Sequence, residues 1–519
     1  MSKGERFLPS YDAIVVGAGL GGLTAAARLA KEGKSVLLLE QHNMTGGYAT
    51  SFVRGRYEFE ASLHEACECG DGKNGTGYGA VRKMFDDLGV ETDWRLVPDA
   101  YRVVLPEMGI DFTMPFGIEN AIAAIEELEP GNGKKVRNYF KLFEEINEAL
   151  EYIGSCGKEG PEPKVMATKY SSFLRAAAYE TSEVNKAFKF GPKTEHVLNA
   201  YYGYISRRLS EASFIVWAQM IYIYLRDGAH VTNKTSHALA NDIEKAFRKH
   251  GGQLELGVKV VKYLIEDGRC VGVRTSDGTE IRAKFVISNG NPTVTLADMI
   301  DRKDVPEEAL KLASVRTQLG SPFLVYMGLD ALPEEMGIES YEYFMGPDMD
   351  TERIWRESNE WKPHAKVSAT CIDVAIPGMT GPDRCQLNFT TIYNPDAMHD
   401  AAPSKYDYLP ENERFANSLI DYFEKTTGTK IRDHIEELVI ATPATFARYS
   451  NAFRGNIYGY TCTALDGAVP RKLRAEEERY IPGLDFVGSA GVRAHGYSSV
   501  ITNGYDVAGD ALEKMGGAQ

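Results

Sequence analysis

The amino-acid sequence predicts an α/β fold, in which a Rossmann-like parallel sheet with an inserted β-meander is joined to a mixed α+β unit. Three observations predict it: a strand-glycine-helix-strand unit near the N-terminus, short strands separated by Asp-Gly turns in the middle, and a helix of small residues near the C-terminus. The 519 residues suffice for several domain-sized pieces. We therefore expect a large core and a second unit.

The first element is a buried parallel strand followed by a glycine turn. Tyr11 to Val16 is apolar and rich in β-branched residues. Gly17, Gly19 and Gly22 follow at GxGxxG spacing, and a helix begins near Leu20. The glycines permit a tight turn, leave room for a pyrophosphate beside the backbone and let the helix pack on the strand, and the helix N-terminus attracts phosphate. The pattern predicts a dinucleotide-binding turn.

An acidic residue ends the second strand of this unit. The helix runs to about Lys31 and stops at Gly33, and the strand from Ser35 to Leu39 ends at Glu40. A carboxylate at this position accepts hydrogen bonds from ribose hydroxyls and repels a 2′-phosphate. Glu40 therefore favours FAD or NAD over NADP.

A second glycine pair follows the acid. The stretch "GGYATSFVRGRYEFE" begins with Gly46 and Gly47. It resembles the extended fingerprint of the FAD-dependent amine oxidase superfamily, and is most similar to the phytoene desaturase, carotenoid isomerase and retinol saturase branch. The resemblance implies FAD as the cofactor, held in an FAD-binding Rossmann-like domain of the GR2-type, with the paired glycines close to it.

The middle of the chain predicts a three-stranded meander inserted into the same unit. From Gly251, short alternating strands are separated by the turn signals Asp267-Gly268 and Asp277-Gly278, and an apolar strand from Phe285 to Ser288 returns to the sheet. The resemblance implies that the backbone of Val260 meets the adenine ring.

The C-terminal block predicts a strand, a glycine loop and a helix. The strand runs from Leu484 to Val487, Gly488 and Gly496 lie in the loop, and the helix begins near Tyr497. Such a helix directs unsatisfied N–H groups and partial positive charge at whatever precedes it. The resemblance implies that this is the flavin N1/O2 edge, and that the turn at Arg454 also lies beside the cofactor.

Because these blocks come from both ends and the middle of the chain, the FAD-binding domain must be discontinuous. The segments between them form a substrate domain. The predicted division is FAD-binding 8–94, substrate 95–225, FAD-binding 226–299 with the meander, substrate 300–440 and FAD-binding 441–519.

Proton transfer needs acid/base groups near the cofactor. The candidates are His64 and Glu65, which follow the second glycine block, and His495, at the mouth of the last helix. A His-Glu pair in a low-dielectric cleft acquires separated proton affinities suited to acid/base catalysis. The alternative is that Glu65 forms a buried ion pair with an arginine such as Arg493 or Arg54.

The resemblance implies hydride transfer between flavin N5 and a C–C bond of an extended hydrophobic, unsaturated substrate such as a polyene, isoprenoid, retinoid or enone. Saturation, desaturation and redox-neutral isomerisation all remain open. So does the electron partner, which can be oxygen, a quinone, a ferredoxin-like protein or a transiently bound nicotinamide. The alternatives are a flavin amine oxidase and, outside enzymes, a prenyl or protein carrier like the GDP-dissociation inhibitors.

Two stretches depart from the family pattern or invite a second interpretation. Asn233 and Lys234 stand where relatives carry a glycine pair, and "VRAHGYSS" replaces a proline-glycine cluster, so the pocket can differ.

An aromatic-rich stretch predicts core packing, with a minority of side chains lining an apolar tunnel. Its members are Tyr201, Tyr202, Tyr204, Trp217, Tyr222 and Tyr224.

Composition excludes several classes. The net charge of −15 disfavours nucleic acid and anionic lipid surfaces, although hydrophobic peripheral contact with a membrane stays compatible. The most apolar segment, Phe214 to Leu225, is too short for a transmembrane span and predicts a buried helix. The N-terminus lacks a signal-peptide pattern, so we expect a cytoplasmic protein. The seven cysteines predict reduced thiols, and no ligand spacing predicts a metal site.

Overall fold

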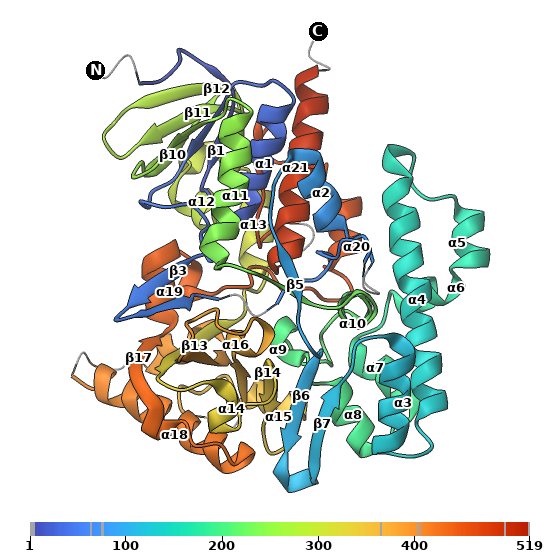
Figure 1. Cartoon of the computed structure of the whole chain (residues 1–519). Coiled ribbons are helices and arrows are strands. Elements are labelled where there is room, and N and C mark those ends of the chain that lie inside the picture. The colour runs from blue at the N-terminus through green and yellow to red at the C-terminus, as the bar shows by residue number, and fades with distance from the viewer. Residues whose placement is uncertain are drawn as a thin grey trace.

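Two seven-stranded sheets dominate the molecule. The computed structural model describes residues 6–62, 65–73, 77–363, 366–401, 404, 406–491 and 495–516. Figure 1 shows the first sheet near the two chain ends and the second at the opposite end of the molecule. The chain passes between them repeatedly, so that segments distant in sequence meet along their boundary.

The first sheet contains the predicted parallel core. Its buried strands pair in parallel in the order β9, β2, β1, β12 and β18. Carboxyl ends of parallel strands meet at one edge of such a sheet, which is where ligands bind in open α/β folds. The bounds are β1 (Tyr11–Val16), β2 (Val36–Leu39), β9 (Gln253–Glu255), β12 (Glu280–Ser288) and β18 (Leu484–Phe486).

The predicted meander is confirmed and shares a strand with this core. Strands β10 (Val260–Glu266) and β11 (Arg269–Thr275) pair antiparallel across the Asp267-Gly268 turn. The first half of β12 pairs with β11, and its second half pairs in parallel with β1. One long strand therefore fixes the meander relative to the parallel sheet.

The second sheet is mixed and has the order β17, β13, β16, β15, β14, β6 and β7, with only β14 and β6 parallel. Its strands come from widely separated parts of the chain, so its register depends on tertiary packing. The bounds are β6 (Tyr101–Leu105), β7 (Ile110–Met114), β13 (Ser321–Leu329), β14 (Glu342–Met345), β15 (Val367–Thr370), β16 (Cys385–Tyr393) and β17 (Ile435–Ala441). Two short pairs, β3 (Ser51–Arg54) with β4 (Tyr57–Glu60) and β5 (Trp94–Leu96) with β8 (His230–Thr232), complete the strands of the described residues.

Helices α1 (Leu20–Lys31), α11 (Ser236–Lys249) and α21 (Tyr497–Gly516) pack together beside the first sheet (Figure 1). The approach of α1 and α21 is so close that a Cβ added at Gly504 would lie 2.2 Å from the carbonyl oxygen of Gly21. The C-terminal helix is thereby held against the first helix.

Helices α3 (Ile118–Leu128), α4 (Gly133–Ser155) and α10 (Phe214–Asp227) pack around one core beside the second sheet. Helix α10 is buried over most of its length, as predicted, and no helix of the described residues is long and apolar enough to span a membrane. The remaining α-helices are α2 (Ala80–Leu88), α5 (Pro163–Lys169), α6 (Ser171–Ala176), α7 (Thr181–Phe188), α8 (Pro192–Leu198), α9 (Tyr202–Ile205), α12 (Pro292–Asp298), α13 (Glu307–Val315), α14 (Pro333–Met336), α15 (Thr351–Glu357), α16 (Ile372–Ala375), α17 (Pro395–Ala401), α18 (Tyr408–Thr427), α19 (Pro443–Ser450) and α20 (Ala468–Leu473).

Substituting Gly504→Ala should lower the midpoint of thermal unfolding. Alanine is ordinarily better than glycine in a helix by roughly 0.5–1 kcal/mol, but here its methyl group would meet the Gly21 backbone, and overpacking costs about 1–3 kcal/mol. The control is Gly154→Ala in α4, where an added Cβ meets nothing within 4 Å. We expect the control to keep or raise the midpoint; equal behaviour of the two variants would contradict the packing argument.

Candidate functional site

The glycine turn after β1 has the geometry that its spacing predicts. Gly17 has a φ of 94°, which favours glycine, and Gly19 caps the N-terminus of α1. A Cβ added at Gly22 would lie 2.1 Å from the carbonyl oxygen of Gly17. Gly17, Gly19 and Leu20 line a large cavity, whereas Gly22 lies behind them and permits the turn to close.

Glu40 is held in place by two backbone amides. Its Oε2 accepts a hydrogen bond from Ala18 N at 2.7 Å, and its Oε1 accepts one from His42 N at 2.9 Å. The side chain is buried yet lines the cavity. Each carboxylate oxygen has a further lone pair, so the group retains acceptor capacity for ribose hydroxyls.

The second glycine pair packs directly on the first. Gly46 N donates to Ala18 O at 2.8 Å, and an added Cβ at Gly46 would lie 2.1 Å from Ala49 O. An added Cβ at Gly47 would lie 3.2 Å from the Cα of Gly19. Both glycines line the cavity, so a ligand can approach the backbone here without meeting a side chain.

Asn289, which the motif analysis missed, occupies the centre of these glycines. Its backbone N–H donates to Val16 O at 2.8 Å, so it continues the β12 pairing beyond the strand. Its side chain lies 2.6 Å from the position of a Cβ on Gly19 and 2.6 Å from that on Gly488. One feature of the sequence could have indicated Asn289: it is an amide residue directly after the buried end of β12, which pairs with β1 just before the glycine turn.

The other predicted cofactor residues divide into two groups. Val260, Gly488, Gly496 and Tyr497 line the cavity, and Tyr497 begins α21. The Arg454 side chain does not line it, because it pairs instead with Asp396. The following residues of the turn reach the cavity in its place, namely Asn456, Ile457 and Tyr458.

The cavity has a volume of about 2250 Å³ and extends from Glu40 to the second sheet. Its far end is lined by Ser368 of β15 and Thr390 of β16.

Of the six aromatic side chains singled out in the sequence, half line the cavity, namely Tyr202, Tyr204 and Tyr224. The others pack in the core, namely Tyr201, Trp217 and Tyr222. Asn233 and Lys234 do not line the cavity, and Asn233 bonds to Asp93.

Glu65 is the predicted acid/base group that the structure brings to the cavity. Its side chain is buried, its Oε1 accepts a hydrogen bond from Tyr201 Oη at 3.2 Å, and its Oε2 has no partner among the described residues. Burial, reinforced by the nearby carboxylate of Glu342, raises the pKa of Glu65 well above its ordinary value. The raised pKa favours the protonated form of Glu65. His64 lies outside the described residues.

His495 reaches the same region. Its Nε2 lies 2.6 Å from the carbonyl oxygen of Tyr204, and its ring stacks on Tyr458 at 4.2 Å. Burial lowers the pKa of His495. In the neutral ring, Nε2 donates to the carbonyl, which leaves Nδ1 as an acceptor that is buried without a partner among the described residues.

The short helix α9 connects these groups to two ionisable residues that sequence reasoning missed. Tyr204 Oη donates to both carboxyl oxygens of Glu342, at 2.8 and 3.0 Å. Lys366 lies with its Nζ 4.8 Å from the centroid of the Tyr202 ring. Glu342 and Lys366 come from the second sheet and from the residue before β15, so no local pattern predicts that they meet α9.

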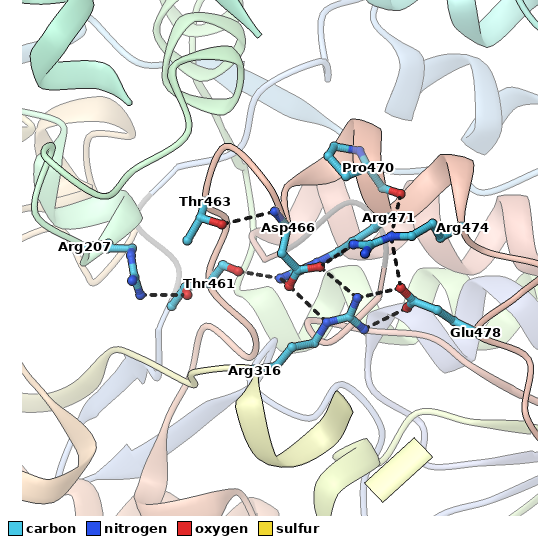
Figure 2. A network of polar contacts seen from close by, with 9 residues as sticks. All are labelled: Arg207, Arg316, Thr461, Thr463, Asp466, Pro470, Arg471, Arg474 and Glu478. Atoms are coloured by element: carbon cyan, nitrogen blue, oxygen red, sulfur yellow. Dashed lines mark hydrogen bonds and ion pairs between the residues drawn. The ribbon is translucent and has the colours of Figure 1, made fainter. Parts of the chain in front are cut away.

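An ion-pair network holds one wall of the cavity. Figure 2 shows Asp466 facing three arginines. It accepts bonds from Arg316 at 2.9 and 3.0 Å, from Arg471 at 2.9 Å and from Arg474 at 3.2 Å, and Arg316 also bonds to Glu478. Burial alone would raise the pKa of Asp466, but the arginines outweigh it and lower the pKa to about 2. The wall residues beside this network are Cys462, Ala468, Val469 and Lys472.

The parallel sheet, the glycine turn and the acid at the end of β2 define a dinucleotide-binding oxidoreductase fold with a long substrate cavity. A family model described as an NAD(P)-binding Rossmann-like domain matches residues 15–88. This range covers the end of β1, all of α1 and β2, and the second glycine pair. The match supports the general prediction that the cofactor is a flavin or another nucleotide.

The relatives identify the branch. An all-trans-retinol 13,14-reductase of Danio rerio is 25% identical over 502 residues, covering 90% of this chain and 79% of that protein. A chloroplastic prolycopene isomerase 2 of an Oncidium hybrid cultivar is 22% identical over 480 residues, covering 89% and 76%. The solved structure of wild-type putrescine oxidase bound to putrescine matches with a TM-score of 0.65 and 15% identity, covering 97% of this chain and 99% of its own. The predicted resemblance to the carotenoid and retinol branch of the FAD-dependent amine oxidase superfamily is confirmed.

Replacing Asp466 by Asn should destabilise the protein. The ordinary pKa of this carboxyl group, 3.8, falls to about 2 in the fold, so its stabilising effect is complete above pH 3.8 and is lost as pH falls through about 2. The shift corresponds to about 2 kcal/mol at neutral pH. Thermal unfolding at pH 7 measures it, with Asp421→Asn, an exposed partner of Arg432, as the control. A greater loss of stability in Asp421→Asn than in Asp466→Asn would contradict the stabilising role of Asp466.

Proposed function

We propose that this protein is an FAD-dependent oxidoreductase that saturates a C–C double bond of an extended, hydrophobic, conjugated substrate. The observation that carries the proposal is one continuous cavity. It joins a dinucleotide cradle at Gly19 and Glu40 to Glu65, a buried carboxyl group whose pKa is raised. Cofactor, substrate and proton donor therefore have a common site.

The cradle suits FAD. Glu40 offers acceptor capacity to ribose and would repel a 2′-phosphate. Gly19, Gly46 and Gly47 leave backbone without side chains for a pyrophosphate and a ring system, and the N-terminus of α21 supplies partial positive charge at Tyr497. When bound, FAD would exchange hydride with a carbon atom through its N5 position.

An apolar substrate suits the remainder of the cavity. Large aliphatic side chains from both units line it, namely Ile205, Met220, Ile223, Leu324, Ile392 and Ile457. Burying an extended hydrocarbon against them is favourable by roughly 25 cal/mol per Å². The reductase relative is named for retinol and the isomerase relative for prolycopene, and both names support a polyene.

The raised pKa of Glu65 supports the reductive direction. Saturation requires one proton for each hydride, and an acid that starts protonated is ready to donate it. Its Oε2 has no competing partner among the described residues. Desaturation would require a group that starts as a base. His495 is neutral and accepts through Nδ1, which suits orientation of the substrate or the relay of a proton.

Amine oxidation is the second candidate, and the likeness to putrescine oxidase is one of fold. The sequence relatives reported above are named for retinol and prolycopene, so the polyene assignment has more support. The amine hypothesis stays distinguishable because amines would reduce the oxidised flavin directly.

The first experiment is the visible absorption spectrum of the purified protein, followed through anaerobic dithionite reduction. We expect a flavin spectrum that bleaches on reduction and recovers when a conjugated polyene such as all-trans-retinol is added. A colourless protein that takes up no added FAD would overturn the oxidoreductase proposal and favour a lipid or protein carrier.

Replacing Glu65 by Gln should lower the rate of polyene-dependent flavin reoxidation by about 10²–10⁴-fold, the usual contribution of a positioned acid. In the unmodified protein the rate should fall as pH rises through the elevated pKa of Glu65, and the variant should lack this decline. Stopped-flow absorbance measures both effects.

The matched control is Glu60→Gln. Glu60 is equally buried, but it accepts a hydrogen bond from Ser236 N at 2.8 Å and does not line the cavity. Both variants should keep a dithionite-reducible flavin. Equal rate losses in the two variants would contradict the assignment of Glu65 as the proton donor.

A further inference from the structure

Lys366 is a lysine whose side chain lines the cavity. The residue is 7% exposed and immediately precedes β15. Its Nζ lies 4.8 Å from the centroid of the Tyr202 ring and 3.2 Å from the position of a Cβ on Gly203. Lys366, Tyr202 and Gly203 all line the cavity. The amine therefore faces the space in which the substrate is proposed to lie.

The environment of Lys366 favours the neutral amine. Burial lowers the pKa of Lys366 to about 7, against the opposing effect of Glu342. Within the described part of the chain, the Nζ atom makes no hydrogen bond and no ion pair. About half of the side chains are then uncharged at neutral pH, and a desolvated neutral lysine amine is a nucleophile toward carbonyl carbon.

Glu342 supplies a nearby negative charge. Both of its oxygens accept hydrogen bonds from Tyr204 Oη. The group is 1% exposed, on β14 of the same sheet as β15. A buried carboxylate in this position stabilises a cation formed on Lys366, whereas a carboxylate ligand would add a second negative charge without solvent.

We propose that Lys366 binds an aldehyde group of the unsaturated substrate covalently, as an imine. The proposal rests on the proposed function in that the same cavity holds cofactor and substrate. It narrows the substrate class to a conjugated aldehyde.

The step balances without an oxidant or a reductant. The neutral amine attacks the carbonyl carbon, the C=O electron pair moves to oxygen, and both N–H protons leave with that oxygen as one water molecule while C=N forms. The imine then takes up one proton beside Glu342. The resulting cation is conjugated with the polyene and withdraws electrons from it, which makes its carbon atoms better hydride acceptors.

The experiment is reductive trapping of the purified holoprotein with all-trans-retinal and cyanoborohydride at pH 7, followed by peptide mass mapping. We expect the retinyl group predominantly on the peptide that contains Lys366, approaching one per chain. The Lys366→Met variant should lose this adduct. The Lys245→Met variant, in which a 74%-exposed lysine is removed, should retain it.

A measurement on the unmodified protein keeps the test independent of whether the variant folds. Excess all-trans-retinol, which occupies the cavity without a carbonyl group, should protect Lys366 from trapping by at least tenfold. Adducts spread over exposed lysines, or an adduct at Lys366 that retinol does not suppress, would overturn the proposal. The trapping experiment measures a mass and does not require turnover. A protein without flavin redox activity would therefore refute the proposed function, while the trapping result would still test whether Lys366 forms the imine.

Discussion

The close approach of backbone segments around Asn289 is the constraint on which the rest of the structure depends. The turns at Gly17–Gly22, at Gly46–Gly47 and at Gly488 all contact one another or the side chain of Asn289 at distances that exclude a Cβ. These segments come from the N-terminal, middle and C-terminal parts of the chain. Because the segments meet through glycines and the side chain of Asn289, the order of strands β2, β1, β12 and β18 and the position of α21 are fixed together.

The second constraint is desolvation at the boundary of the two units. The mixed sheet brings Glu342 and Lys366 to α9, whereas Glu65 bonds to Tyr201 just before this helix and His495 contacts the carbonyl oxygen of Tyr204 within it. An ionisable group removed from water changes its proton affinity according to its sign of charge. The pKa of Glu65 rises while those of Lys366 and His495 fall, so one cause favours the neutral form of all three groups.

Local signals account for what could be predicted from the sequence. The glycine turn, Glu40 and the Asp-Gly turns of the meander lie within single supersecondary units, so spacing alone identifies them. Glu342 begins β14 and Lys366 immediately precedes β15, in a mixed sheet whose register depends on long-range pairing. The resemblance placed the turn at Arg454 beside the cofactor, and this stays a prediction; the ion pair of the Arg454 side chain with Asp396 is a long-range contact that no local pattern indicates.

The opposite pKa shifts also explain how a cavity with so many ionisable groups can admit a hydrocarbon. If Glu65 and Lys366 kept their ordinary charges, an entering polyene would have to displace the water that solvates both, at a cost of several kcal/mol for each ion. The raised pKa of Glu65 and the lowered pKa of Lys366 both favour the neutral form, which needs less solvation. The polar chemistry is thus retained in a form that the apolar walls tolerate, and charge develops only when substrate is present to share it.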